Sequence, residues 1–296
     1  MFINLENITD IYFTEFDTSK VVSMDNMFRN CTSITKLDLS GFDTSLVTRM
    51  DNMFAFCEKL NDLKVSSFNT TSVINMNSLF LYCRSLYYLD ITNFKTTSCK
   101  DIGAMFSSMF SIKSLNLNSF DTSSVVNMSK IFFQDYILTS IDLSSFNTSS
   151  VTNMEYMFSE CYLLTSLDLS GFETSSVINM NSMFSHCHSL TSLNIIYFDT
   201  ASVTDMDSMF LHCFQLKTLD LSNFDTRKVT SMYQMFYTCD GLITLNIDNF
   251  NFSSVNSISG MFYNCSSLVS LDLHKLLLSN DLKNSYLKYN IFDESK

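Results

Sequence analysis

Carboxylate side chains recur at one position of a short segment that is repeated along this chain of 296 residues. Each lies between two apolar residues, as in Leu-Asp-Leu, and the row comprises Asp38, Asp90, Asp142, Asp168, Asp220 and Asp272. Asn fills the position in three further copies, and Lys64 interrupts the row. A row of ionised carboxylates on an exposed face can bind a protein or glycan ligand, and we treat these residues as candidate ligand contacts. The alternative, which needs no ligand, is a solvated polar face of a strand.

Thiol side chains form a second row with the same interval. Eight of the nine cysteines belong to it: Cys31, Cys57, Cys83, Cys161, Cys187, Cys213, Cys239 and Cys265. Met109 and Asp135 occupy the two gaps. Because Met can replace Cys, we expect buried free thiols that pack as small apolar groups. Disulfides between adjacent copies are the alternative, so the cysteines do not establish the redox compartment.

The sequence contains few residues in patterns that bind metals or carry out catalysis. His186, His188 and His212 lie close in the repeat, beside two cysteines, but only two consecutive copies carry His there. We therefore expect solvated histidines and no metal site. The chain has no zinc-type Cys pairs, no EF-hand loop, no Gly-rich phosphate loop and no HExxH or GxSxG motif. The sequence predicts no enzyme and no cofactor.

The elements that position these rows come from a repeat of 26 residues without insertion or deletion. One Phe column comprises Phe28, Phe54, Phe80, Phe106, Phe132, Phe158, Phe184, Phe210, Phe236 and Phe262. A second comprises Phe16, Phe42, Phe68, Phe94, Phe120, Phe146, Phe172, Phe198, Phe224 and Phe250. A unit of this length cannot close a core alone, but stacked units bury a continuous one.

Each unit is predicted to hold a strand, a turn and a short helical segment. The alternation in Leu37 to Leu39 is typical of a half-buried strand. After a D/N-T-S turn, Val, Met, Met-Phe and Cys follow at offsets 0, 3, 6, 7 and 10, which form one stripe on a helix. A Thr in the turn is suited to cap that helix or to bond to the next unit. A regular Thr row can also bind ice, which we consider the less simple explanation.

The fold expected is an α/β solenoid of the leucine-rich-repeat type. It is a right-handed stack of about ten units, with a parallel β-sheet on one face and short helical or 3-10 segments on the other. It covers residues 1–276 and begins inside a repeat, with Ile11 and Phe13 as the first strand, and residues 277–296 form a cap or tail. Strands stack about 4.8 Å apart and helices about 8–10 Å, so the sheet is expected on the concave side.

The net charge and the composition argue against several classes of binding partner. The net charge is −12, which argues against nucleic acid or an anionic membrane surface as the main partner. No apolar run approaches the length of a transmembrane helix, and the first ten residues lack the regions of a signal peptide. The chain has 5 Gly and no Pro, so Ser, Thr, Asn and Asp must form its turns.

The repeat resembles that of the BspA-like leucine-rich repeat surface proteins, with the pattern LxxLDLSxFDTSxVTxMxxMFxxCxxL. The matching segments include LTSLDLSGFETSSVINMNSMFSHCHSL and LKTLDLSNFDTRKVTSMYQMFYTCDGL, and the resemblance covers about residues 2–276. It implies a non-enzymatic protein of the cell surface, or a secreted one, that binds host matrix or cells. It transfers no binding residue. Since no signal peptide is visible, we expect a fragment, or alternatively an intracellular scaffold for protein–protein interaction.

Overall fold

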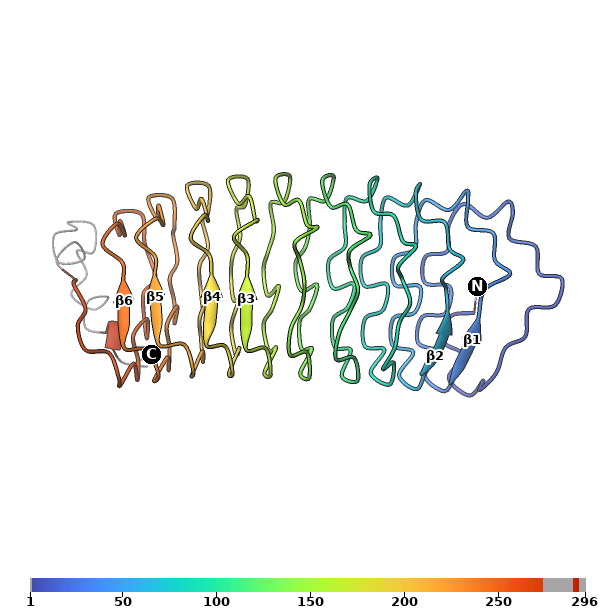
Figure 1. Ribbon diagram of the computed structural model, residues 1–296, viewed down its shortest axis with the longest axis horizontal. Coiled ribbons are helices and arrows are strands. Elements are labelled where there is room, and N and C mark those ends of the chain that lie inside the picture. Colours follow the sequence, from blue (N-terminus) through green and yellow to red (C-terminus); the bar gives the residue numbers. More distant parts are fainter. Residues whose placement is uncertain (1, 274–289, 293–296) are drawn as a thin grey trace. The chain divides into compact units, whose positions relative to one another are not determined.

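The computed structural model describes residues 2–273 and 290–292, which form two compact units, Met1–Ser150 and Val151–Lys296. In each unit the chain winds as a solenoid, and every 26-residue coil lies beside the next (Figure 1). The predicted cap, residues 277–296, falls mostly outside the described residues. Its described part is the 3-10 helix η1 (Asn290–Phe292), where the carbonyl of Ile291 accepts a hydrogen bond of 2.9 Å from the N–H of Phe262.

The Leu-x-Leu segments form fewer strands than expected. In the first unit β1 (Lys36–Asp38) pairs with β2 (Asp62–Lys64); in the second, β3 (Ser166–Asp168) pairs with β4 (Ser192–Asn194) and β5 (Thr218–Asp220) with β6 (Thr244–Asn246). All three pairs are parallel and offset by one repeat. The prediction of one sheet with a strand from every copy is therefore wrong. Leu89 and Leu115 are still buried, so their copies keep the inward side chain without the strand pairing.

The opposite side of each coil is not helical, which corrects the predicted α or 3-10 segments. Among the described residues the repeats contain turns there instead. The N–H of Met27 bonds to the carbonyl of Met24 (3.2 Å), and Asn26 has a φ of 55°, as in a type II turn. The N–H of Phe28 points out of the coil to the carbonyl of Met53 in the next one (2.8 Å). Alternate N–H groups thus bond within the turn and to the neighbouring coil.

This ladder on the turn side is more continuous than the sheet on the strand side. Its parallel bridges run Ser23, Arg49, Asn75, Asp101, Asn127 in the first unit and Asn153, Asn179, Asp205, Ser231, Ser257 in the second. It forces residues such as Phe56 (φ 62°) and Tyr82 (φ 61°) into the left-handed region, at a cost of about 1–2 kcal/mol each. The hydrogen bonds between coils offset that cost.

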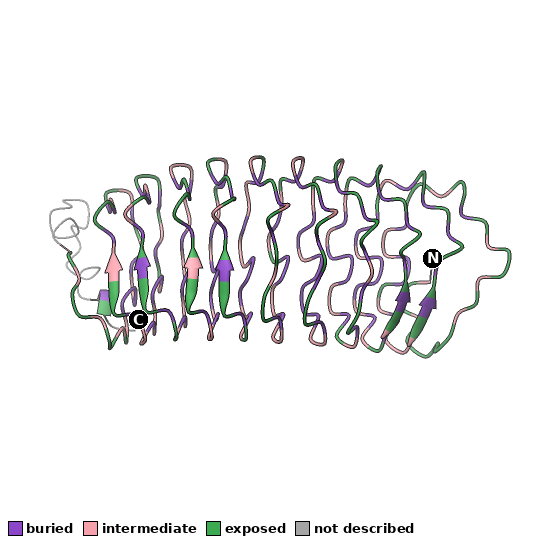
Figure 2. Ribbon diagram, in the orientation of Figure 1, coloured by how far each residue is buried: buried purple, intermediate pink, exposed green. Residues whose placement is uncertain are grey.

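The core consists of stacked side chains of the same type. In Figure 2 the buried residues, drawn in purple, recur from coil to coil. Rings of the turn-side Phe column, such as Phe54 and Phe80, are 5.6 Å apart and nearly parallel. The column that follows the strands is spaced more widely, at 6.3 Å between Phe68 and Phe94. Within residues 2–273, no helical layer separates the coils on the turn side. The physical reason for a concave sheet face therefore disappears.

The Thr row ties coils together rather than capping helices. The buried hydroxyl of Thr122 donates to the carbonyl of Asn147 and accepts from its N–H, both at 2.8 Å. Thr44, Thr70, Thr174, Thr200 and Thr226 repeat this pair of bonds with the residue 25 positions later. The predicted hydrogen bonding between neighbouring repeats is confirmed, and the predicted helix capping by Thr is wrong. Burial of these threonines also excludes ice binding through them.

Asx turns take the place of Pro and Gly. The carboxylate of Asp43 accepts from the N–H of Ser45 (2.9 Å), two residues on, at the start of the turn side. Asn75 accepts in the same way from Asn77 (2.9 Å) further along the coil. The same bond follows the strand, where the Asp row lies.

Candidate functional site

The Asp row lies on the exposed strand face, as expected, and its carboxylates also shape the chain. In each described case the carboxylate oxygen accepts the N–H two residues later, and the acceptors include Asp38, Asp90, Asp142, Asp168 and Asp220. Asn116, Asn194 or Asn246 can occupy the row because an amide oxygen makes the same Asx turn, as Asn116 does with Asn118. The aspartates are thus corner residues of the coil.

Charge along the row is uneven. The carboxylate of Asp38 accepts from the ammonium of Lys64 at 2.9 Å, and this bond and those from Ser40 lower the pKa of Asp38 to about 2. The bonds from Ser144 and Ser170 lower the pKa of Asp142 and Asp168. These carboxylates are therefore ionised at neutral pH. Asp272 is exposed as well.

Cavities on the strand face open where the strand pairing stops. One of them, about 730 Å³, lies between residues 11–17 and residues 38–42. A second, about 330 Å³, separates β2 from residues 87–90, and a third of about 330 Å³ lies between β4 and β5. Each cavity is bounded by segments that are neighbours in the repeat but are not paired as strands. A regular sheet would have left no such openings.

Exposed aromatic residues stand beside these cavities and were missed by the sequence reasoning. Tyr87 and Tyr88 line the second cavity and are 68% and 67% exposed. Tyr197 adjoins Ile196 at the third and is 70% exposed. Most other copies carry Ser, Thr or a charged residue at the position of Tyr88. A comparison of the outward positions between copies could have found these tyrosines.

The histidines form a stacked cluster rather than separate solvated groups. The rings of His186 and His212 are 4.5 Å apart, and His188 lies between Tyr162 (4.6 Å) and Phe214 (4.7 Å). Partial burial lowers the pKa of all three, that of His212 to about 4, so they are neutral at physiological pH. In the described part of the chain, no group of three or more His, Cys, Asp or Glu is arranged to hold a metal ion.

The Cys row has free thiols, and all of its members are buried except Cys265, which is half-buried. The thiol of Cys57 donates to the carbonyl of Phe28 at 3.1 Å, and Cys83, Cys187, Cys213, Cys239 and Cys265 bond to the equivalent Phe in the preceding coil. Burial raises the pKa of these thiols, that of Cys83 to about 12. They are therefore inert packing groups in either redox compartment.

Comparisons with known proteins concern nearly the whole chain. The model of the family described as "Mycoplasma protein of unknown function, DUF285" matches residues 1–116, 100–194 and 164–275. No curated protein matches the sequence. Among the residues that the structure describes, no helix has the length and hydrophobicity needed to cross a bilayer.

Similar solved structures include bacterial leucine-rich repeat proteins. A leucine-rich cell surface protein from Faecalibacterium prausnitzii is 17% identical, with 92% of this chain and 79% of that chain covered and a TM-score of 0.38. A leucine-rich repeat protein from Bacteroides ovatus is 17% identical, with 84% and 81% covered and a TM-score of 0.31. A leucine-rich repeat protein from Eubacterium ventriosum is 12% identical, with 83% of this chain and 74% of that chain covered and a TM-score of 0.37. None of these descriptions names a catalytic activity.

Proposed function

Because this chain belongs to the DUF285 family and folds into leucine-rich-repeat-type coils, we propose that it is a non-enzymatic recognition module. It binds a protein or glycan ligand through the strand face and acts in adhesion at the cell surface. The BspA-like repeat pattern supports the surface role. The acidic row, Asp38, Asp90, Asp142, Asp168, Asp220 and Asp272, supplies the ligand contacts in this proposal.

The observation that carries the proposal is the contrast between inward and outward positions of the coils. The inward positions repeat the same few residue types in copy after copy and are buried. The outward positions beside them differ between copies, and include exposed tyrosines such as Tyr88 and Tyr197. Exposed aromatic residues on a fixed frame are typical of ligand contacts, since Tyr buries a large area and can also form a hydrogen bond.

Binding explains the strand face better than catalysis does. The ionised aspartates lie in Asx turns, whereas His186, His188 and His212 belong to the turn side of the coil, where stacking occupies their rings. The intracellular scaffold, our alternative, would use the same strand face. The buried thiols do not favour either location, because they are inert in both.

Binding to arrays of extracellular-matrix proteins and of glycans tests the proposal. The variant Tyr87→Ser/Tyr88→Ser removes exposed aromatic area but keeps residue types that the strand face already accepts. Ile74→Thr is the matched control, because Ile74 is 49% exposed on the turn side and Thr48 occupies the same position one copy earlier.

We expect the wild-type chain to bind at least one array component, and the tyrosine variant to bind it about tenfold more weakly. The control should bind like wild type. A folded wild-type chain that binds nothing on either array would refute the proposal. Equal losses in the variant and in the control would refute the strand face as the binding surface.

A further inference from the structure

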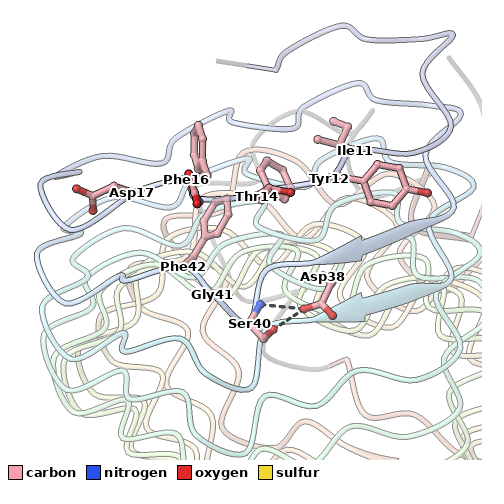
Figure 3. A pocket seen from close by; sticks show the side chains of 11 residues that line it. Ile11, Tyr12, Thr14, Phe16, Asp17, Asp38, Ser40, Gly41 and Phe42 are labelled. Atoms are coloured by element: carbon pink, nitrogen blue, oxygen red, sulfur yellow. Dashed lines mark hydrogen bonds between the residues drawn. The ribbon is translucent and has the colours of Figure 1, made fainter.

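A slot separates the first coil from β1. Residues 11–17 form one wall and residues 38–42 the other, and the volume enclosed is about 730 Å³ (Figure 3). This volume lies within the range of small-ligand and peptide pockets. The sequence predicted a strand here, with Ile11 and Phe13 paired beside β1. The structure shows neither strand nor bridge at these residues.

The first coil lacks the corner turn that the second coil makes beside the slot. In the second coil Asp38 accepts the N–H of Ser40, and the N–H of Phe42 bonds to Leu39 (3.0 Å). Tyr12 occupies the position of Asp38 in the first coil and cannot form the Asx turn. The segment from Tyr12 onwards then runs apart from β1.

Both walls of the slot present unpaired backbone. In residues 2–273, no N–H of residues 11–16 donates to a protein acceptor. The backbone bond between the first coil and this end of β1 runs from the N–H of Thr35 to the carbonyl of Thr9, at 3.4 Å. β1 is paired with β2 on its other side only. Unpaired strand edges are templates for an added extended segment.

The lining of the slot is acidic and aromatic. Glu15, Asp17 and Asp38 line it, and none of the lining residues is Lys, Arg or His. The ring of Phe42 lies 5.6 Å from that of Phe16, and Figure 3 shows both rings between the two walls. Carboxylates beside aromatic rings favour a cationic group over an anionic one. Lys64, which pairs with Asp38, neutralises part of this charge.

We infer that the slot between residues 11–17 and β1 binds an extended, basic peptide segment of a protein partner. The peptide backbone pairs with the edge of β1 and with the first coil. Because side chains of an extended segment alternate, one set meets the Phe rings while the basic set meets Glu15, Asp17 and Asp38. A free amine lacks the backbone groups that both walls require. This inference rests on the proposed function and names the ligand class at one place.

Two variants separate the slot from the rest of the strand face. A Cβ at Gly41 or at Gly171 would meet no heavy atom within 4 Å, and Tyr197 already stands at the equivalent position of another copy. Gly41→Tyr fills the slot, and Gly171→Tyr is the matched control, because Gly171 is the equivalent residue of another repeat and does not line the slot. Asp17→Asn removes one charge and keeps the Asx turn, as Asn69 does in its own copy.

The probe is a fluorescein-labelled hexapeptide of alternating Lys or Arg and Val, followed by fluorescence anisotropy with the full chain. Its acidic counterpart, a copy with N-methyl groups on alternate residues, and spermidine as competitor are the comparison ligands. We expect the basic peptide to bind, and the acidic and N-methylated peptides to bind at least about tenfold more weakly. Gly41→Tyr should abolish binding, Asp17→Asn should weaken it, and Gly171→Tyr should leave it unchanged.

Hydrogen exchange gives an independent readout. The N–H groups of residues 11–16 should exchange rapidly in the free chain and more slowly with the basic peptide. No binding of the basic peptide, equal binding of the N-methylated copy, or full displacement by spermidine would overturn the inference. If the chain binds an array component but does not bind the basic peptide, this inference is overturned and the proposed function stands. Failure of both experiments would overturn the proposed function too.

Discussion

Asp135 is the position where one substitution should stabilise the protein most. It occupies the Cys row, is fully buried, and accepts the N–H of Met109 at 2.9 Å through Oδ1. Its Oδ2 is buried and has no hydrogen-bond partner. In other coils the N–H at the Met109 position bonds to the Phe carbonyl three residues earlier. Asp135→Cys should restore that arrangement and remove a buried polar atom without a hydrogen-bond partner, whose burial costs about 1–3 kcal/mol.

The gain should grow with pH. Burial raises the pKa of Asp135 well above its usual value, so the folded chain keeps this carboxyl protonated while the unfolded chain ionises it above about pH 4. The unfolded state then binds fewer protons, and the free energy of unfolding of the wild type falls as pH rises. The slope is about 1.4 kcal/mol per pH unit until the folded pKa is reached. Below pH 4 the contribution vanishes.

Urea denaturation between pH 3.5 and 8 gives the free energy of unfolding of the wild type and of Asp135→Cys. Their difference measures this effect, because the contributions of the titrating groups that both proteins share cancel. Asp135→Asn is the control, since it cannot ionise and keeps an oxygen for the N–H of Met109. We expect the difference from wild type to increase with pH for both variants. A wild type that equals or exceeds Asp135→Cys in stability at pH 7, or a difference independent of pH, would refute the reasoning.

Three further predictions concern the frame. Thr122→Val should cost about 1–3 kcal/mol of unfolding free energy, because the backbone N–H and carbonyl of Asn147 both lose their bond to the buried Thr122 hydroxyl, whereas Thr122→Ser should cost far less; urea denaturation distinguishes them, and equal costs would contradict the hydroxyl bridge. Asn52 has a φ of 56°, so Asn52→Val should lower the free energy of unfolding by about 1–2 kcal/mol, whereas Asn52→Gly should change it little. Thermal unfolding measures both. Iodoacetamide at pH 8 should leave Cys57 and Cys83 unmodified in the native chain and modify them in urea, as read by mass spectrometry, because burial raises the pKa of both thiols; rapid native labelling would contradict that packing.

The inward side chains were predictable because the repeat places them. A period of 26 residues aligns each Phe, Met, Leu and Cys with its copy, and burial of every column requires only that the coils stack. The exposed position of the Asp row followed from the alternation around Leu37 and its equivalents. Its corner role was predictable in principle, since Asp and Asn are the residues that form Asx turns.

The turn side was predicted wrongly because its hydrogen bonds are not local. Offsets of 0, 3, 6, 7 and 10 fit one face of a helix, and they fit a series of turns equally well. The partner of the N–H of Phe28 is Met53, 25 residues later, and a pattern within one coil cannot show it. The same bond between coils holds residues such as Tyr82 in the left-handed region, which local propensity disfavours.

The length of the coil, the side chains that point inward and the use of Ser, Thr, Asn and Asp in the turns follow from the amino-acid pattern. Which backbone groups pair between coils, and which are left without a partner, is visible only in the three-dimensional structure. The slot beside β1 depends on this difference, because the N–H groups of residues 11–16 and one edge of β1 are left without backbone partners. Side-chain burial follows the 26-residue repeat of the sequence. Backbone pairing depends on the distance between two neighbouring coils, and this distance differs from one pair of coils to the next.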